Sequence, residues 1–339
     1  MTAIDRDPSA AGGDDDPARD LLAALPEGSG TLLTGAFDVH VHGQPDLSPA
    51  LENRGDDRAV MRLARAYGMS GWVLKSHLWI TTDRAARLQE EAGEGFTVYG
   101  SVTLNPPMGG VSAAVVELAA AHGARVVFLP TWGSAADVDR GGYISRLLGQ
   151  IAPSFPGYAA KNAVSLLAPS AAPSAAPSGA PSGRLSGECR EVIDACRGLG
   201  LALATGHASL AESRAVAAYC ADIGQRLLIT HPLHYTQDPA ELRELADLGA
   251  YVEFCNGPLL HPDSHLTVHQ VHEAMSALGP DRIVLSTDAF SRWAPAEPEC
   301  LRIFTEQLAY LGWQPGQLHQ MTADNPRAFL GIAPTEAAS

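Results

Sequence analysis

Short apolar segments alternate with amphipathic segments along most of the chain, and this alternation is the strongest constraint on its fold. Eight runs have the composition of buried strands: 34–41, 71–77, 96–104, 124–130, 201–207, 226–231, 250–255 and 282–288. Helical patterns lie between and after them: 57–67, 83–92, 111–122, 187–199, 209–222, 239–248, 267–278 and 298–311. Eight strand–helix units with nearly continuous apolar strands predict an α/β protein of the (β/α)8 TIM barrel type.

A doubly wound open sheet is the alternative arrangement of such units. No G-x-G-x-x-G follows the first predicted strand, and no G-x-x-x-x-G-K-[ST] occurs in the sequence. Helix starts are well marked, because Ser209 with Glu212 and Thr267 with Gln270 fit the capping box, and Asp238 precedes a proline. The barrel therefore remains the favoured prediction.

Two segments have compositions that do not suit a packed core. Residues 1–20 are acidic and rich in small residues, so we expect a disordered tail. Residues 168–183 repeat Pro, Ser and Ala, which predicts a flexible Pro/Ala/Ser-rich insertion at about 167–185, between the fourth strand and the fourth helix. Residues 21–335 are then expected to form a single barrel domain.

Composition narrows the classes of partner. The formal net charge of −15 makes a nucleic acid partner improbable, because binding the phosphate backbone requires clustered Lys and Arg. The five cysteines form no C-x-x-C pair, and no apolar stretch is long enough for a membrane helix. We expect a cytoplasmic protein with a small-molecule substrate and no membrane partner; the sequence leaves open a homo-oligomer.

Histidines and an aspartate stand where the predicted strands end. The first strand contains His40 and His42 on alternate positions, which places both imidazoles on one face. The fifth, sixth and eighth strands end in His207, His231 and Asp288. Because these ends meet at one mouth of a barrel, the five side chains predict a site for a divalent cation, most simply Zn²⁺.

The motifs DVHVHG, TGH, ITH and STD resemble the metal-binding pattern of the amidohydrolase superfamily, and the closing MTADNPRAFLGI is similar to its terminal helix. The resemblance spans about 34–332, with the Ala-Pro-Ser insertion unmatched. It implies a distorted barrel with one or two metal ions that activate a water. It also implies that His40, His42, His207 and His231 are ligands, and that Asp288 is a ligand that accepts the proton of the attacking water.

One departure from the family pattern concerns the fourth strand. Its end reads Phe-Leu-Pro-Thr, so the carbamylated lysine or glutamate that bridges two ions in many members is missing there. Lys75 on the second strand either replaces that bridge as a ligand, acts as an ammonium toward substrate or a proton, or forms a structural salt bridge. His77 on the same strand is a candidate further ligand or substrate contact.

Three further residues are candidates for substrate binding. Glu253 interrupts the apolar seventh strand, where a carboxylate is costly unless it is paired. Asn256 follows the seventh strand and Arg292 the eighth, where loops of a barrel set specificity. A salt bridge for Glu253 and a surface position for Arg292 are the structural alternatives.

The function expected from these residues is hydrolysis by a metal-activated water. We expect cleavage of a C–N bond in an amide, cyclic amide or amidine, with Asp288 as the base. A lactonase, deaminase, phosphoester hydrolase or decarboxylase fits the same site, because the fold and ligands do not select a substrate. The non-enzymatic alternative is a catalytically silent barrel that binds a small molecule.

Overall fold

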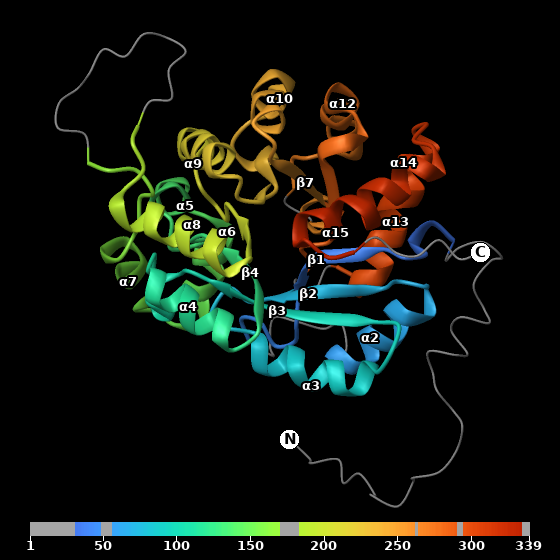
Figure 1. Cartoon of the computed structure of the whole chain (residues 1–339), viewed down its shortest axis with the longest axis horizontal. Coiled ribbons are helices and arrows are strands. Elements are labelled where there is room, and N and C mark those ends of the chain that lie inside the picture. The colour runs from blue at the N-terminus through green and yellow to red at the C-terminus, as the bar shows by residue number, and fades with distance from the viewer. Residues whose placement is uncertain (1–30, 49–55, 170–182, 262–263, 290–293, 334–339) are drawn as a thin grey trace, which may run out of the picture.

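Eight parallel strands form one sheet in chain order, so the barrel prediction is confirmed and the doubly wound order is wrong (Figure 1). The computed structural model describes residues 31–48, 56–169, 183–261, 264–289 and 294–333. The strands are β1 (Phe37–His42), β2 (Gly71–Lys75), β3 (Thr97–Thr103), β4 (Ala124–Phe128), β5 (Ala202–Ala204), β6 (Leu227–Ile229), β7 (Tyr251–Cys255) and β8 (Ile283–Ser286). Each pairs in parallel with the next along the chain.

Polar contacts join β8 to β1 and nearly close the barrel. The Thr287 hydroxyl donates to Oδ2 of Asp38 at 2.6 Å, and the Asp288 N–H donates to the His40 carbonyl at 3.0 Å. Burial raises the pKa of Asp38 to about 6, although its hydrogen bonds oppose that shift. This junction places the ends of the first and last strands side by side.

Eight helices match the predicted segments closely: α2 (Asp57–Ala66), α3 (Thr82–Ala92), α4 (Ala113–Ala121), α8 (Gly187–Leu199), α9 (Leu210–Ile223), α10 (Pro239–Asp247), α12 (Val268–Leu278) and α13 (Glu297–Tyr310). Both predicted capping boxes are present, and the Asp238 side chain accepts from the N–H of Ala240. Helices α11 (Gly257–Leu260), α14 (Pro315–His319) and α15 (Asn325–Leu330) complete the second half, with a π-helical turn at Gln320–Asp324. Single 3-10 turns lie at Thr31–Leu33, Pro106–Met108, Pro232–His234 and Pro280–Arg282.

Apolar side chains fill the barrel and the layer between strands and helices. Phe37, Val39 and Phe128 belong to the interior cluster, whereas Val41 packs in the outer layer. The alternation that places His40 and His42 on one face would also place Val39 and Val41 together, yet these valines belong to different clusters, because the register shifts between Asp38 and Val41. The five cysteines, all of them among the described residues, are buried and form no disulfide bond.

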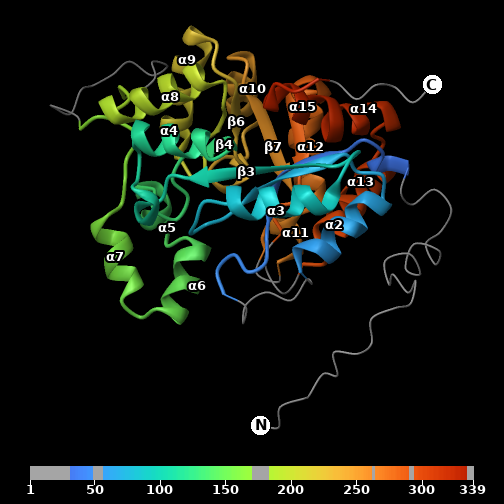
Figure 2. The same cartoon turned by 60° about the horizontal axis from the view of Figure 1, so that its bottom comes forward.

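Three helices that the sequence patterns left unassigned lie between β4 and α8. They are α5 (Ala135–Arg140), α6 (Tyr143–Ile151) and α7 (Phe155–Lys161), and Figure 2 shows α6 and α7 standing off from the barrel. They share a small apolar cluster that includes Leu47, Trp132, Ile144 and Leu148. We call residues 131–167 the inserted helical segment.

The Pro/Ala/Ser-rich insertion follows this segment, in the predicted place before α8. Leu167 and Leu185 form an antiparallel bridge, and the Ala168 N–H donates to the Arg184 carbonyl at 2.7 Å. Residues 170–182 and the predicted tail at 1–20 lie outside the described residues. In the described part of the chain, no helix combines the length and apolar character needed to cross a bilayer.

Candidate metal centre

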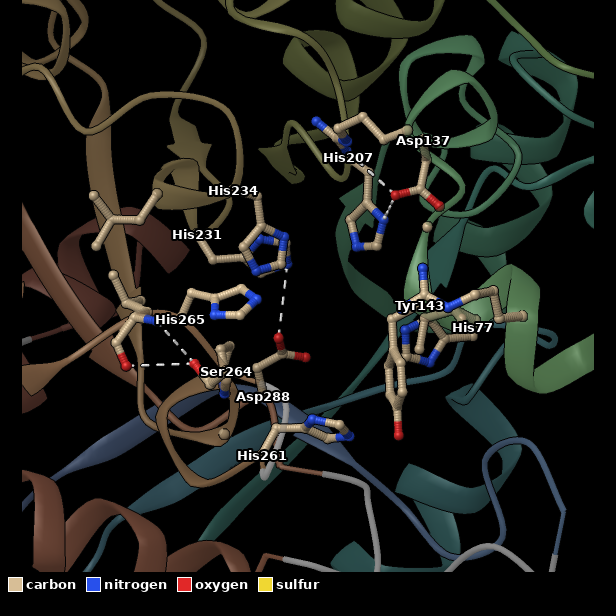
Figure 3. Close-up of a pocket in the computed structure, with 18 of the residues that line it drawn as sticks. His77, Asp137, Tyr143, His207, His231, His234, His261, Ser264, His265 and Asp288 are labelled. Atoms are coloured by element: carbon tan, nitrogen blue, oxygen red, sulfur yellow. Dashed lines mark hydrogen bonds and ion pairs between the residues drawn. The ribbon is translucent and has the colours of Figure 1, made fainter.

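A cavity of about 490 Å³ opens at the end of the barrel where the strand-end histidines lie (Figure 3). His207 and Asp137 lie on one side of it, and His231, His234 and His265 on the other. Asp288 and His77 also line it. The cavity has both ionisable groups and apolar walls, as small-molecule sites do.

His40, His42 and Asp288 form one of three clusters of possible ligand atoms among the described residues. Nε2 of His40 lies 3.1 Å from Oδ1 of Asp288, and Nε2 of His42 lies 3.0 Å from the same oxygen. All three residues are buried, and their ligand atoms lie within 4.8 Å of one another. The structure thus brings both histidines of β1 to the aspartate that follows β8.

Carboxylates hold the opposite nitrogen of three histidines. Nδ1 of His40 lies 3.1 Å from Glu253, Nδ1 of His42 lies 2.8 Å from Asp46, and Nδ1 of His207 lies 3.0 Å from Asp137. An Nδ1–H that donates to a carboxylate leaves the Nε2 lone pair free to bind a cation. These contacts assign the same tautomer to the three rings.

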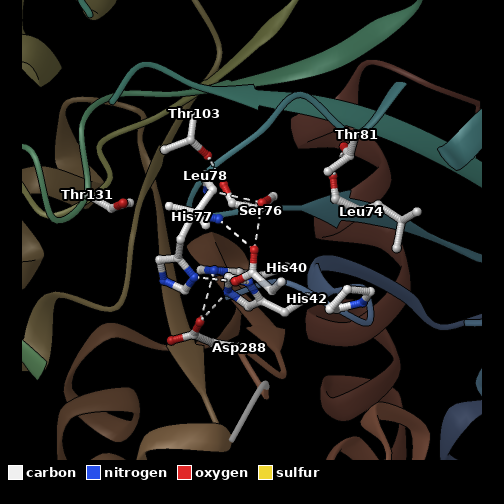
Figure 4. A network of polar contacts seen from close by, with 12 residues as sticks. His40, His42, Leu74, Ser76, His77, Leu78, Thr81, Thr103, Thr131 and Asp288 are labelled. Carbon is white, nitrogen blue, oxygen red and sulfur yellow. Dashed lines mark hydrogen bonds and ion pairs between the residues drawn. The ribbon is translucent and has the colours of Figure 1, made fainter. Parts of the chain in front are cut away.

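Asp46 joins His42 and His77, two of the predicted site residues, in one network. Figure 4 shows both histidines together with Ser76 and Asp288. Its Oδ2 accepts from the rings of His42 and His77, which stack with centroids 4.3 Å apart. Its Oδ1 accepts from the Ser76 hydroxyl at 2.6 Å. Burial raises the pKa of Asp46, but the two histidines outweigh it and hold that pKa well below the usual range.

The donor set fits a divalent cation. With Nδ1–H bonded to carboxylates, two Nε2 lone pairs face one carboxylate oxygen at about 3 Å, an arrangement that a proton or a cation must bridge. Burial and Lys75 lower the pKa of His40, but Asp288 and Glu253 outweigh them and raise it to about 9. Burial alone would raise the pKa of Asp288, yet His40 and His42 hold it well below normal. The cluster therefore requires a positive charge, supplied by a proton or a cation, between the two histidines and Asp288.

His231 and His207 extend the cluster along the cavity. Nε2 of His231 lies 3.7 Å from Oδ2 of Asp288, and the His207 and His231 ring centroids are 5.1 Å apart. Burial lowers the pKa of His231 well below its usual value, which keeps its imidazole neutral. His207 thus lies next to His231 and outside the cluster of His40, His42 and Asp288.

Backbone conformation near these residues is unusual in the way functional sites often are. His231 has a backbone φ of +26° and Asp288 one of +47°, values that residues other than glycine seldom adopt. Gly206 has φ +59°, and a Cβ there would lie 2.3 Å from the Leu129 carbonyl oxygen. Only glycine fits this approach, which sets the position of His207.

Lys75 lies at the end of β2 with no exposed surface. Among the described residues its Nζ has no hydrogen-bond partner, and it lies 5.3 Å from the Phe128 ring centre. Burial lowers its pKa, while the charges of Asp288, Asp46 and Glu253 oppose that shift. Lys75 does not line the cavity, and a structural salt bridge is absent from the described contacts.

The remaining predicted substrate contacts have different surroundings. Glu253 is fully buried beside His40 and also accepts from the Ser286 hydroxyl at 2.7 Å, so it faces a histidine and not the cavity. Asn256 is buried at the start of α11, also outside the cavity lining. Arg292 lies outside the described residues.

Sequence patterns missed several residues that the structure places at the site. Asp46 follows His42 by four positions, a spacing that carries no strong signal in a loop. Asp137 comes from the unassigned inserted helical segment, as do Arg140 and Arg146 of the cavity wall. His234 follows His231 by one short turn, and the two ring centroids are 4.3 Å apart. The motif ITHPLH was the available clue for His234.

Comparison with known proteins assigns the chain to a family. The sequence profile of a family of unknown function, DUF6282, matches residues 35–253. The chain belongs to DUF6282. The DUF6282 match includes His40, His42, Lys75, His207 and His231, whereas Asp288 lies beyond it. No curated protein matches the sequence of this chain.

Solved structures share the fold of this DUF6282 protein, which confirms the resemblance to the amidohydrolase superfamily at the level of the fold. An amidohydrolase from Pseudomonas aeruginosa has a TM-score of 0.54 and 13% identity, covering 89% of this chain and 99% of its own. The organophosphorus hydrolase from Deinococcus radiodurans has a TM-score of 0.51 and 16% identity, covering 89% and 94%. A structure engineered for organophosphate hydrolysis from a weak promiscuous lactonase template has a TM-score of 0.53 and 16% identity, covering 89% and 97%.

Proposed function

We propose that this DUF6282 protein is a hydrolase that uses a divalent metal ion, most simply Zn²⁺, to cleave a C–N bond of a small amide, cyclic amide or amidine. The observation that carries the proposal is the shared oxygen of Asp288, which lies 3.1 Å from Nε2 of His40 and 3.0 Å from Nε2 of His42. Imidazole nitrogens and a carboxylate oxygen are the ligands of catalytic zinc sites. The hydrolase scaffold of the similar structures supports the proposal.

We propose His40, His42, His231, His207 and Asp288 as the ligands. When bound, the ion would supply a water of lowered pKa and polarise the bond under attack. Glu253, Asp46 and Asp137 hold the rings of His40, His42 and His207 in the orientation that presents Nε2. This preorganisation offsets the entropy that free imidazoles would lose on binding a cation.

Asp288 is the proposed base. Its pKa is held well below the usual range, so the carboxylate is ionised and can accept a proton from the attacking water. Asp288 lines the cavity, within reach of a substrate there. The same carboxylate would then return the proton to the leaving nitrogen, which completes hydrolysis with no net proton change.

Lys75 is proposed as an additional ligand in carbamylated form. Its lowered pKa increases the fraction of neutral amine, which adds CO₂ to form a carbamate and releases one proton. The carbamate would supply the anionic oxygens that the fourth strand lacks, because that strand ends in Phe128 and is followed by Leu129 and Pro130. His77 is proposed to contact substrate from the cavity wall, while Asn256 and Arg292 keep that role only as proposals from the sequence.

Lactone and organophosphate hydrolysis form the second candidate function. The observation that favours it is the similarity to the organophosphorus hydrolase and to the engineered lactonase template. The same activated water attacks a lactone carbonyl or a phosphorus centre.

The test begins with metal analysis of the purified protein, followed by turnover of matched amides, lactones and phosphotriesters after loading with Zn²⁺. We expect near-stoichiometric metal and highest kcat/KM with an amide. Highest kcat/KM with a lactone or phosphotriester would select the second candidate. Absence of bound metal in the native protein, with no binding on addition of Zn²⁺, would refute both and leave the silent binding barrel.

A further inference from the structure

We propose that the cavity takes substrates that carry an anionic group at the end remote from the scissile bond, and that Arg146 recognises this group. The inference rests on the proposed function, because it names the substrate class of the same cavity. The favoured substrate is therefore a carboxylate-bearing amide and not a neutral one.

Arg146 is the cavity residue whose charge is left available. Its Nη1 donates to the Gly141 carbonyl, and its guanidinium carbon lies 5.8 Å from the Tyr143 ring centre. Neither contact neutralises a charge, and among the described residues no carboxylate oxygen lies within 4.0 Å of its nitrogens. The side chain is exposed and lines the cavity, so a ligand can reach it.

Arg140 lines the same wall but is already paired. Its Nη2 lies 3.2 Å from Oδ1 of Asp137, the oxygen that also accepts from His207. Arg140 therefore helps to hold Asp137, which in turn orients the proposed ligand His207. The carboxylate of Asp137 largely compensates the charge of Arg140. This contrast assigns anion recognition to Arg146.

The charge balance of the lining supports the same assignment. Its only described carboxylates are Asp137, paired with Arg140 and His207, and Asp288 at the metal centre. The chain as a whole carries a formal charge of −15, so a positive wall is opposite in sign to the average surface. An anionic ligand is therefore attracted to this wall although the chain as a whole is negatively charged.

The wall of the cavity is partly apolar. Ile144, Leu233, Pro258 and Leu266 line the cavity together with Ala294. In Figure 3, Tyr143 lies across the cavity from His231 and Asp288, and the guanidinium carbon of Arg146 lies 5.8 Å from the Tyr143 ring centre. A short apolar spacer between the scissile bond and the anion fits this order of groups.

Hexanoate and hexanamide form a matched pair of probes, because they differ in charge and share the apolar chain. Calorimetry with the Zn²⁺-loaded protein measures both dissociation constants for the native chain, Arg146→Met, Arg146→Lys and Arg87→Met. Arg87 is an exposed arginine on α3 outside the cavity and serves as the control. We expect Arg146→Met to weaken hexanoate binding by about tenfold, Arg146→Lys to retain part of it, and Arg87→Met to change nothing.

Hexanamide should bind all four proteins equally. Hexanoate binding that is unchanged in Arg146→Met would overturn the inference, because the carboxylate would then sit on the metal ion or elsewhere. Hexanoate binding no tighter than hexanamide binding in the native chain would overturn it too. Circular dichroism of each variant establishes that the comparison is between folded proteins.

Turnover separates this inference from the proposed function. Hexanoic anilide and the mono-anilide of adipic acid share the scissile amide and differ by a terminal carboxylate. We expect the native protein to prefer the acid by about tenfold in kcat/KM, and Arg146→Met to lose that preference through KM. Arg146-dependent hexanoate binding without any hydrolysis would refute the proposed function alone, whereas hydrolysis without a preference for the acid would refute the inference alone.

Discussion

Nδ1 of His40 on β1 lies 3.1 Å from Oε1 of Glu253 on β7, and neither side chain has exposed surface. A carboxylate buried at this depth is costly unless it is paired. Contacts with His40 and Ser286 offset the cost of burying Glu253, and Glu253 orients the imidazole of His40. The pair joins strands separated by more than 200 residues of sequence.

Replacing Glu253 with Gln should lower the affinity for Zn²⁺ by about 10- to 100-fold, because the neutral amide no longer increases the basicity of His40. Competition with a chelator of known affinity measures the dissociation constant. Glu244→Gln, at a half-exposed position on α10, is the control. Equal affinities in Glu253→Gln and the native protein would contradict the role assigned to Glu253.

Replacing Asp288 with Asn should leave most of the metal bound, since the histidines remain, and should lower kcat by about 10² to 10⁴. Metal analysis and steady-state kinetics on the best substrate measure the two effects separately. Asp247→Asn, at the exposed end of α10, should change neither. A native rate in Asp288→Asn would remove it as the base.

Metal-free protein should lose stability as the pH rises from 6.5 toward 9. The pKa of His40 is about 9 in the folded chain against 6.5 in the unfolded one, so its contribution is complete below 6.5 and is lost as the pH passes 9. Thermal unfolding in the presence of a chelator should show this fall. Zn²⁺ should reduce it, because the ion takes the place of the proton. The exposed His122 provides a control as His122→Gln, which should preserve the profile, whereas His40→Gln should flatten it.

Replacing Lys75 with Met should reduce the metal content without lowering the Tm of the metal-free protein. Burying an ammonium is costly and Met has a similar length, so the substitution removes a proposed ligand while relieving the desolvation penalty. Carbon-13 NMR after incubation with labelled bicarbonate detects the carbamate in the native chain. Full metal content in Lys75→Met, or no carbamate signal in the native chain, would exclude the bridging role.

Deleting residues 170–182 should change the Tm by no more than a few degrees. The flanking residues Ala168 and Arg184 are joined by a backbone hydrogen bond of 2.7 Å, so a short turn can replace the deletion, and loop-closure entropy depends only weakly on length. Calorimetric unfolding measures the difference. Loss of cooperative folding would show that the insertion contributes to the core.

Periodicity predicted the barrel well because each strand and helix carries its own local signal. The eight strands and their eight helices lie close to the predicted ranges, and the caps at Ser209 and Thr267 form as expected. The chain direction of parallel strands then placed His40, His42 and Asp288 at one end. These predictions needed only the order of residues along the chain.

Other parts of the site depend on contacts that no local pattern encodes. Asp46 and Asp137 reach histidines from loops and from the inserted helical segment, and their direction is set by tertiary packing. The sequence showed that Glu253 was an anomaly in an apolar strand, but not that it faces His40 instead of the cavity. The register shift in β1 likewise comes from pairing with β2.

The segment between β4 and α8 serves two ends of the pocket at once. One of its acids, Asp137, holds Nδ1 of His207, while Tyr143 and Arg146 line the cavity. Any redesign of substrate preference that exchanges this stretch must therefore preserve an acid at position 137. Without that acid, the imidazole of His207 would lose the contact that fixes its orientation.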